Sequence, residues 1–142
     1  MRKAAVAAAL TAGLLSACTQ APAVVNFTAL LDGSSEVPPT SSPGMGTATA
    51  DLGLAQRVLR WNIQYTGLTG PAIAAHFHCP AGPGVNAPVV VPLHGDLGSP
   101  ISGIAIVDPA TFSALLANQC YVNIHTPANP GGEIRGQLVR TP

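Results

Sequence analysis

In Val58-Leu59-Arg60-Trp61-Asn62-Ile63-Gln64-Tyr65, apolar side chains occupy every second position from Leu59 onward. A β-strand points successive side chains to opposite faces, so Leu59, Trp61 and Ile63 fall on one face together with Tyr65. We therefore expect a half-buried strand over residues 58–65.

Short runs of the same kind recur along the chain, separated by turns that draw on 15 glycines and 14 prolines. Runs of β-branched and apolar residues between Gly and Pro are typical of many short strands. The predicted strands are residues 25–31, 46–54, 58–65, 72–79, 89–93, 101–107, 121–125 and 133–138.

One segment, residues 108–118, has the features of a helix instead. Asp108 can cap it, Pro109 suits the first turn, and Phe112, Leu115 and Leu116 form an apolar stripe. Eight short strands and one short helix predict an all-β fold, an antiparallel Greek-key β-sandwich or barrel.

The N-terminal segment has the order of a secretory signal. The basic start Met1-Arg2-Lys3 precedes an apolar run over residues 4–15, which is too short to span a bilayer. We expect residues 1–17 to be a signal peptide, residues 18–25 a tether and residues 26–140 the folded domain.

The junction Leu15-Ser16-Ala17-Cys18 resembles the bacterial lipobox. That resemblance implies cleavage before Cys18, lipid attachment to its sulfur and a membrane anchor. Thr19 stands where aspartate would favour the inner membrane, which implies an outer-membrane lipoprotein of the bacterial cell envelope. The alternative is an ordinary signal peptide that contains a cysteine.

Cleavage there would leave four arginines, no lysine and six acidic residues, a net charge of −2 with neutral histidines. A weakly acidic domain without a basic stripe does not fit nucleic-acid binding. The expected partners are a metal ion, the membrane through Cys18, and an envelope protein.

Two cysteines remain after Cys18 is assigned to lipid, namely Cys79 and Cys120. An even pair in an oxidising compartment predicts a disulfide. Two buried free thiols are the alternative.

The four histidines supply candidate metal ligands. His76 and His78 stand two apart on a predicted strand, so both face the same side, with Cα atoms about 7 Å apart. If the two cysteines bond and their strands share a sheet, the alternation of side chains along each strand places His125 on the same side of the sheet as His76 and His78. His125 is then a third ligand. His94, at a strand end, is a less certain fourth. Neutral imidazole binds copper or zinc, and we expect copper, with zinc as the alternative.

Three charged residues can support such a site. Glu133 and Arg135 share a face of the last strand, either in a cross-strand ion pair or loop contacts, or with Arg135 as a guide for an anion. Glu36 and Glu133 can accept a hydrogen bond from the second nitrogen of a ligating histidine. Glu36 can instead pair with Arg135.

Five segments resemble the CHRD domain, a module described in chordin and found alone in bacterial exported proteins. The resemblance covers roughly residues 26–139 and implies a compact β domain. The residues that carry it are Leu30-Leu31-Asp32-Gly33-Ser34-Ser35-Glu36-Val37-Pro38-Pro39, Gly67-Leu68-Thr69-Gly70-Pro71, Ala75-His76-Phe77-His78, Tyr121-Val122-Asn123-Ile124-His125-Thr126 and Asn129-Pro130-Gly131-Gly132-Glu133-Ile134-Arg135-Gly136-Gln137-Leu138.

The order of the histidines is also similar, more weakly, to that of copper-zinc superoxide dismutases. Those proteins combine a Greek-key fold, a His-x-His strand, a disulfide and a late arginine. The aspartate-rich zinc loop is missing here, so the likeness is to a copper-only arrangement.

These observations lead to two hypotheses. The first is a lipid-anchored, extracytoplasmic metal-binding β domain that stores copper or performs simple redox chemistry such as superoxide dismutation. The second is a non-enzymatic envelope module whose histidines are structural. The sequence leaves open whether the protein is an enzyme.

Overall fold

The structure, a computed structural model, describes residues 23–142. The predictions of a signal peptide over residues 1–17, of lipidation at Cys18 and of most of the tether therefore lie outside the described residues. Within residues 23–142, no helix has the length and apolar character that crossing a membrane requires.

Nine strands and one helix follow one another within residues 23–142. They are β1 (Val24–Asp32), β2 (Met45–Gly53), β3 (Val58–Thr66), β4 (Ala74–His78), β5 (Val89–Pro92), β6 (Ile101–Ile106), α1 (Pro109–Leu116), β7 (Tyr121–His125), β8 (Ile134–Gln137) and β9 (Val139–Arg140). The eight predicted strands are confirmed, the last of them as β8, which lies beside β7 and β1. A ninth strand, β9, follows the predicted range and lies beside β1 alone.

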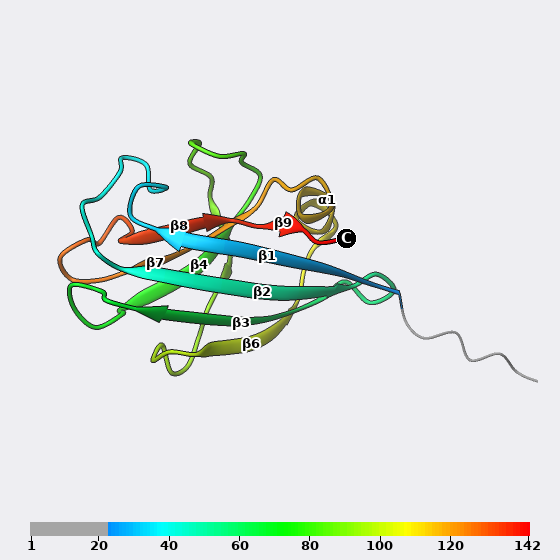
Figure 1. Cartoon of the computed structure of the whole chain (residues 1–142). Coiled ribbons are helices and arrows are strands. Elements are labelled where there is room, and N and C mark those ends of the chain that lie inside the picture. The colour runs from blue at the N-terminus through cyan, green and yellow to red at the C-terminus, as the bar shows by residue number, and fades with distance from the viewer. Residues whose placement is uncertain (1–22) are drawn as a thin grey trace, which may run out of the picture.

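The strands form one antiparallel sheet that curls into a nearly closed barrel (Figure 1). Their order is β5-β4-β7-β8-β1-β2-β3-β6, so β5 and β6 are its two ends. Residues of both end strands line one cleft of about 340 Å³, which marks the seam. The connections β3–β4 and β6–β7 join strands that are not neighbours, as a Greek key requires. The all-β Greek-key prediction is thus confirmed.

The core lies inside the barrel and follows the alternation of the strands. Leu59, Trp61 and Ile63 of β3 are buried, while Arg60 between them and Gln64 after them are exposed. On β4, Ala75 and Phe77 enter the same core. The side chains at the alternate positions of β4, which include both histidines, therefore lie on the outer face of the barrel.

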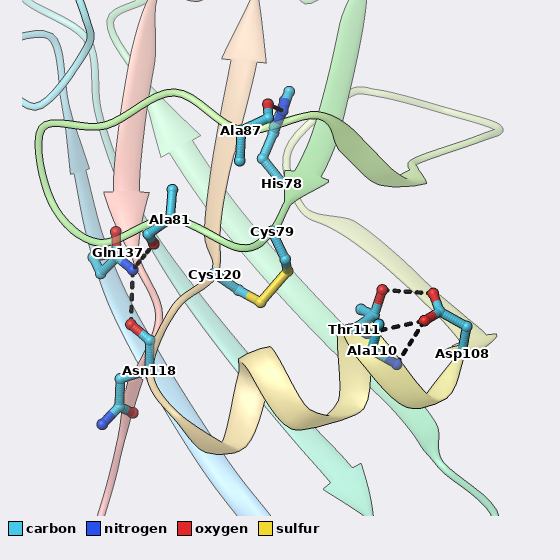
Figure 2. Close-up of a disulfide and its surroundings, with 10 residues drawn as sticks. All are labelled: His78, Cys79, Ala81, Ala87, Asp108, Ala110, Thr111, Asn118, Cys120 and Gln137. Atoms are coloured by element: carbon cyan, nitrogen blue, oxygen red, sulfur yellow. Dashed lines mark hydrogen bonds between the residues drawn. A yellow bond between two sulfur atoms is a disulfide. The ribbon is translucent and has the colours of Figure 1, made fainter.

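Helix α1 begins as the sequence predicts. The Asp108 carboxylate accepts hydrogen bonds from the backbone N–H groups of Ala110 and Thr111 and from the Thr111 hydroxyl (Figure 2). These bonds satisfy amides that the first turn of a helix leaves free. The helix lies at the end of the barrel near the C-terminus (Figure 1).

A disulfide joins Cys79, just after β4, to Cys120, just before β7, beside α1 (Figure 2). Both cysteines are buried. The predicted pairing is confirmed, and it ties together the two strands that carry the histidines.

Candidate metal centre

Strands β4 and β7 are hydrogen-bonded neighbours, and their register assembles the site. Ala74 lies opposite His125, His76 opposite Asn123, and His78 opposite Tyr121. Residues opposite one another in an antiparallel pair point to the same face. The expectation that the histidines of the two segments share one side of the sheet is therefore confirmed.

Three of the four histidines converge on this face. The candidate ligand nitrogens of His76, His78 and His125 all lie within 4.8 Å of one another. Nδ1 of His76 is 3.0 Å from Nε2 of His125. His78 and His125 are buried, and His76 is half-buried. The group thus lies just below the surface, and His76 is its most exposed member.

Backbone carbonyls hold the outer nitrogens of two of these rings. Nδ1 of His78 donates to the carbonyl of Ala87 at 2.8 Å, and Nδ1 of His125 donates to the carbonyl of Pro130 at 2.9 Å. A carbonyl can only accept, so each Nδ1 carries the hydrogen. The Nε2 lone pair of each ring is then directed into the site. Metal-ligating histidines are commonly held in this way.

The environment favours the neutral form of His76 and of His125. Burial, followed by the nearby charges of His125, His78 and His94, lowers the pKa of His76 to about 4. Burial also lowers the pKa of His125, although its bond to the Pro130 carbonyl opposes this. Neutral imidazole is the form that binds a metal.

Asn123, for which the sequence predicted no role, contacts two of the three histidines. Its Oδ1 is 3.1 Å from Nε2 of His78 and 3.0 Å from Nε2 of His125, and the residue is 3% exposed. Its place in the sequence could have identified it, because Asn123 stands two residues before His125 and so points to the same face of the strand.

The structure gives Arg135 a different environment from that of an anion guide. The residue is 2% exposed, and its guanidinium donates to the carbonyl of Val85 at 2.6 Å and to Oδ1 of Asn86 at 3.0 Å. Its Cζ also lies 3.3 Å from the ring centroid of Tyr121. The guanidinium therefore does not face solvent. It links Val85 and Asn86 to Tyr121 of β7.

Glu36 is buried near the site, where it lies beside Asn123 rather than beside a histidine. The outer nitrogens of His78 and His125 bond to backbone carbonyls, so Glu36 is not their acceptor. Burial raises the pKa of Glu36 to about 7, although the charge of Arg135, the amide of Val37 and the side chain of Asn123 oppose this.

Gly132 allows this close packing. It has a φ of +130°, and a β-carbon there would lie 2.4 Å from Oε1 of Glu36 and 2.8 Å from Nδ2 of Asn123. Only glycine fits where the backbone passes so close to both side chains.

Glu133 binds loops rather than a histidine. Its fully buried carboxylate accepts hydrogen bonds from Ser42, Thr69, Thr126 and Asn129. Burial opposes ionisation, but the hydrogen bonds from Ser42, Thr126 and Thr69 outweigh it and hold the pKa at about 2. The expectation of loop contacts is the one that the structure supports.

His94 stands apart from the other three. It is exposed, lines the cleft at the β5–β6 seam, and is not part of the three-histidine group. Its effect on the pKa of His76 shows that it is nonetheless a neighbour.

Comparison with known families gives one match. The family model of the CHRD domain matches residues 27–138, most of the chain. No curated protein and no solved structure shows significant similarity to the chain.

Proposed function

The chain belongs to the CHRD domain family, and we propose that it is a metal-binding β domain whose ion is held by His76, His78 and His125. The observation that carries the proposal is the convergence of these three imidazoles, two of which have their outer nitrogens bound to backbone carbonyls. That arrangement leaves Nε2 of His78 and Nε2 of His125 as lone pairs aimed at one place.

Hydrogen-bond counting supports a cation there. Nε2 of His125 can accept one hydrogen, from Nδ1 of His76. His78 and His125 both carry their hydrogen on Nδ1, so their Nε2 atoms have none. Oδ1 of Asn123 also has none, so its contacts with these two Nε2 atoms are not hydrogen bonds. Facing lone pairs in a buried site are unfavourable without a positive charge between them, and the lowered pKa of His76 and of His125 disfavours a proton in that role.

We propose copper as the ion, with zinc as the alternative. Imidazole nitrogen suits both, and a given nitrogen site binds Cu²⁺ more tightly than Zn²⁺. The cysteines do not compete as ligands because they are joined in a disulfide.

Among the activities compatible with such a site, we propose binding or storage ahead of superoxide dismutation. A dismutase benefits from a cation that steers the anion to the metal. The guanidinium of Arg135 is enclosed by Val85, Asn86 and Tyr121, so it does not offer that guidance.

Metal content tests the proposal. The exported protein, without a histidine tag, is loaded with Cu(II) or Zn(II), and the bound ion is counted by native mass spectrometry. We expect one ion per chain, lost in His76→Ala and in His125→Ala. His94→Ala is the matched control and retains the ion. An ion-free protein, or equal binding in His125→Ala, would refute the proposal.

We also propose that the domain is anchored in the cell envelope through lipid on Cys18. The support is the lipobox-like junction and the disulfide, which suits an oxidising compartment. Metabolic labelling with a radioactive fatty acid checks the anchor: label on the wild type and none on Cys18→Ser is expected, and an unlabelled wild type argues against it.

The second candidate function is an envelope interaction module. A cleft of about 540 Å³ on the outer face of the barrel is lined by residues that include Leu30, Met45 and Tyr65, and Leu30 is 77% exposed. Exposed apolar surface of this kind can mark a protein contact. Cross-linking in cells with a photoreactive residue at position 30 tests it, with position 60 on β3 as the control.

A further inference from the structure

We propose that Oδ1 of Asn123 is the fourth ligand of this centre, so that the ion is held by one amide oxygen and three imidazole nitrogens. The inference rests on the proposed function and extends it by naming a donor of a different chemical class. It starts from the position of Asn123 on β7, directly opposite His76 and buried to 97%.

Distances between the donor atoms match those around a single ion. Two ligands each about 2.1 Å from a metal are about 3.0 Å apart at right angles and about 3.4 Å apart at the tetrahedral angle. Oδ1 of Asn123 lies 3.1 Å from Nε2 of His78 and 3.0 Å from Nε2 of His125. Nδ1 of His76 lies 3.0 Å from the same Nε2 of His125. Three of the distances among the four atoms therefore match those between neighbouring ligands, and the three imidazole nitrogens all lie within 4.8 Å of one another.

The amide is turned so that its oxygen, not its nitrogen, faces the histidines. On the other side of Asn123, Nδ2 and Oε1 of Glu36 both approach Gly132. In its ionised form the Glu36 carboxylate only accepts, so it favours Nδ2 as its neighbour. Turning the amide over would place Oδ1 beside Oε1 of Glu36, which has no hydrogen-bond donor in the part of the chain that the structure describes.

Asn123 is thus a buried oxygen donor on the histidine face, because its Oδ1 contacts two imidazole nitrogens while its Nδ2 packs near Gly132. The oxygen lies next to Nε2 of His78 and Nε2 of His125, while Glu36 and Gly132 pack behind the amide. An oxygen ligand favours divalent ions over the softer Cu(I). We therefore expect the centre to bind Cu(II) or Zn(II), with Asn123 contributing to that selectivity.

Spectroscopy on two variants tests the inference. Cu(II) is bound to the exported protein, to Asn123→Leu and to Asn123→Asp, and electron paramagnetic resonance is recorded together with affinity by chelator competition. We expect Asn123→Leu to bind Cu(II) about 10–100-fold more weakly with changed g and hyperfine values, and Asn123→Asp to retain tight binding. Asn62→Ala, on the outer face of β3, is the control and leaves both unchanged.

A measurement on the unmutated protein covers the case in which Asn123→Leu does not fold. The ¹³Cγ resonance of Asn123 is followed by NMR as Zn(II) is added, with that of Asn62 as the reference. A shift at Asn123 alone supports coordination through Oδ1. An unmoved Asn123 resonance, while the histidine ring resonances shift, would overturn the fourth ligand and leave the three-histidine site intact. Histidine resonances that do not respond at all would instead refute the proposed function.

Discussion

The ring of Tyr121 lies flat against the ring of His78, with centroids 4.7 Å apart and planes 3° from parallel. Arg135 stacks on the same tyrosine, and the Tyr121 hydroxyl accepts a hydrogen bond from the N–H of Ala87, whose carbonyl in turn holds Nδ1 of His78. The plane of the His78 ring is therefore set by the protein. A ligand held in place before the ion arrives loses less conformational freedom on binding.

Removing this stack should weaken metal binding. In Tyr121→Leu, His78 keeps its bond to Ala87 but loses the ring that fixes its plane, so we expect the affinity for Cu(II) to fall about 10-fold or more. Tyr121→Phe keeps the stack and loses one hydrogen bond, so it should retain the affinity at a cost of about 1 kcal/mol of stability. Chelator competition and urea unfolding measure the two effects. Equal affinities in Tyr121→Leu and Tyr121→Phe would show that the stack does not position His78.

The protonation of His76 should occur well below the usual range for histidine. Because burial and the neighbouring histidines lower the pKa of His76 to about 4, we expect its ring resonances in the metal-free protein to titrate near that pH. A proton competes with a metal at pH values near and below the pKa of the ligand, so protonation of His76 should not displace bound Cu(II) at pH 5. Proton NMR of the apo protein checks the first point, and metal content against pH checks the second. A His76 midpoint near 6.5 would contradict the burial argument.

Glu133 should be a strong determinant of stability above pH 4.5. Its folded pKa of about 2 lies below the ordinary 4.5, so its ionised form stabilises the native state at neutral pH. That contribution is lost as the pH falls from 4.5 to 2. We expect Glu133→Gln to reduce the free energy of unfolding at pH 7 by about 2–3 kcal/mol.

The control for Glu133→Gln is Asp51→Asn. The side chain of Asp51 is 43% exposed and makes a 3.8 Å ion pair with Arg60, so its change should stay within about 1 kcal/mol. Urea unfolding of both variants at pH 7 makes the comparison. Similar losses in the two would mean that the loop contacts of Glu133 are not stabilising.

Glu36 should give the stability a pH dependence opposite to that of Glu133. Its folded pKa is raised from 4.5 to about 7, so the native state binds a proton more tightly than the unfolded chain does. This contribution is fully present below pH 4.5 and is lost as the pH rises to 7, by up to about 3 kcal/mol. Glu36→Gln should flatten the decline between pH 4.5 and 7 in the metal-free protein. An unchanged pH profile in urea unfolding would show that Glu36 titrates normally.

Adjacent glycines offer a matched test of the packing behind the site. A β-carbon on Gly132 would meet Glu36 and Asn123, whereas one on Gly131 meets nothing within 4 Å. Gly132→Ala should therefore destabilise the fold by about 1–3 kcal/mol and weaken Cu(II) binding, through strain and the displaced amide. Gly131→Ala should change neither by much. Comparable effects of the two substitutions would exclude a specific role for Gly132.

The strands and part of the site followed from local patterns. Alternation in β3 predicted the buried face of Leu59, Trp61 and Ile63, and parity around Cys79 and Cys120 predicted that the histidines share a side. These predictions succeed because the two-residue period of a strand and the chemistry of a cysteine pair are properties of the chain itself.

The environments of Asn123, Arg135 and Glu133 could not be predicted in that way. Parity placed Asn123 beside His125, but its contact with Glu36 needs a loop nearly 90 positions away. Arg135 is enclosed by residues 85 and 86, and Glu133 by three separate loops.

Those contacts depend on how irregular segments pack across the outer face of the barrel. No periodicity in the sequence encodes that packing, because loops have no repeating side-chain direction. The alternation of apolar and polar residues in the sequence therefore specified which strands form and which residues share a face. Only the tertiary structure decided which of the charged residues is buried, which is paired, and which amide reaches the histidines.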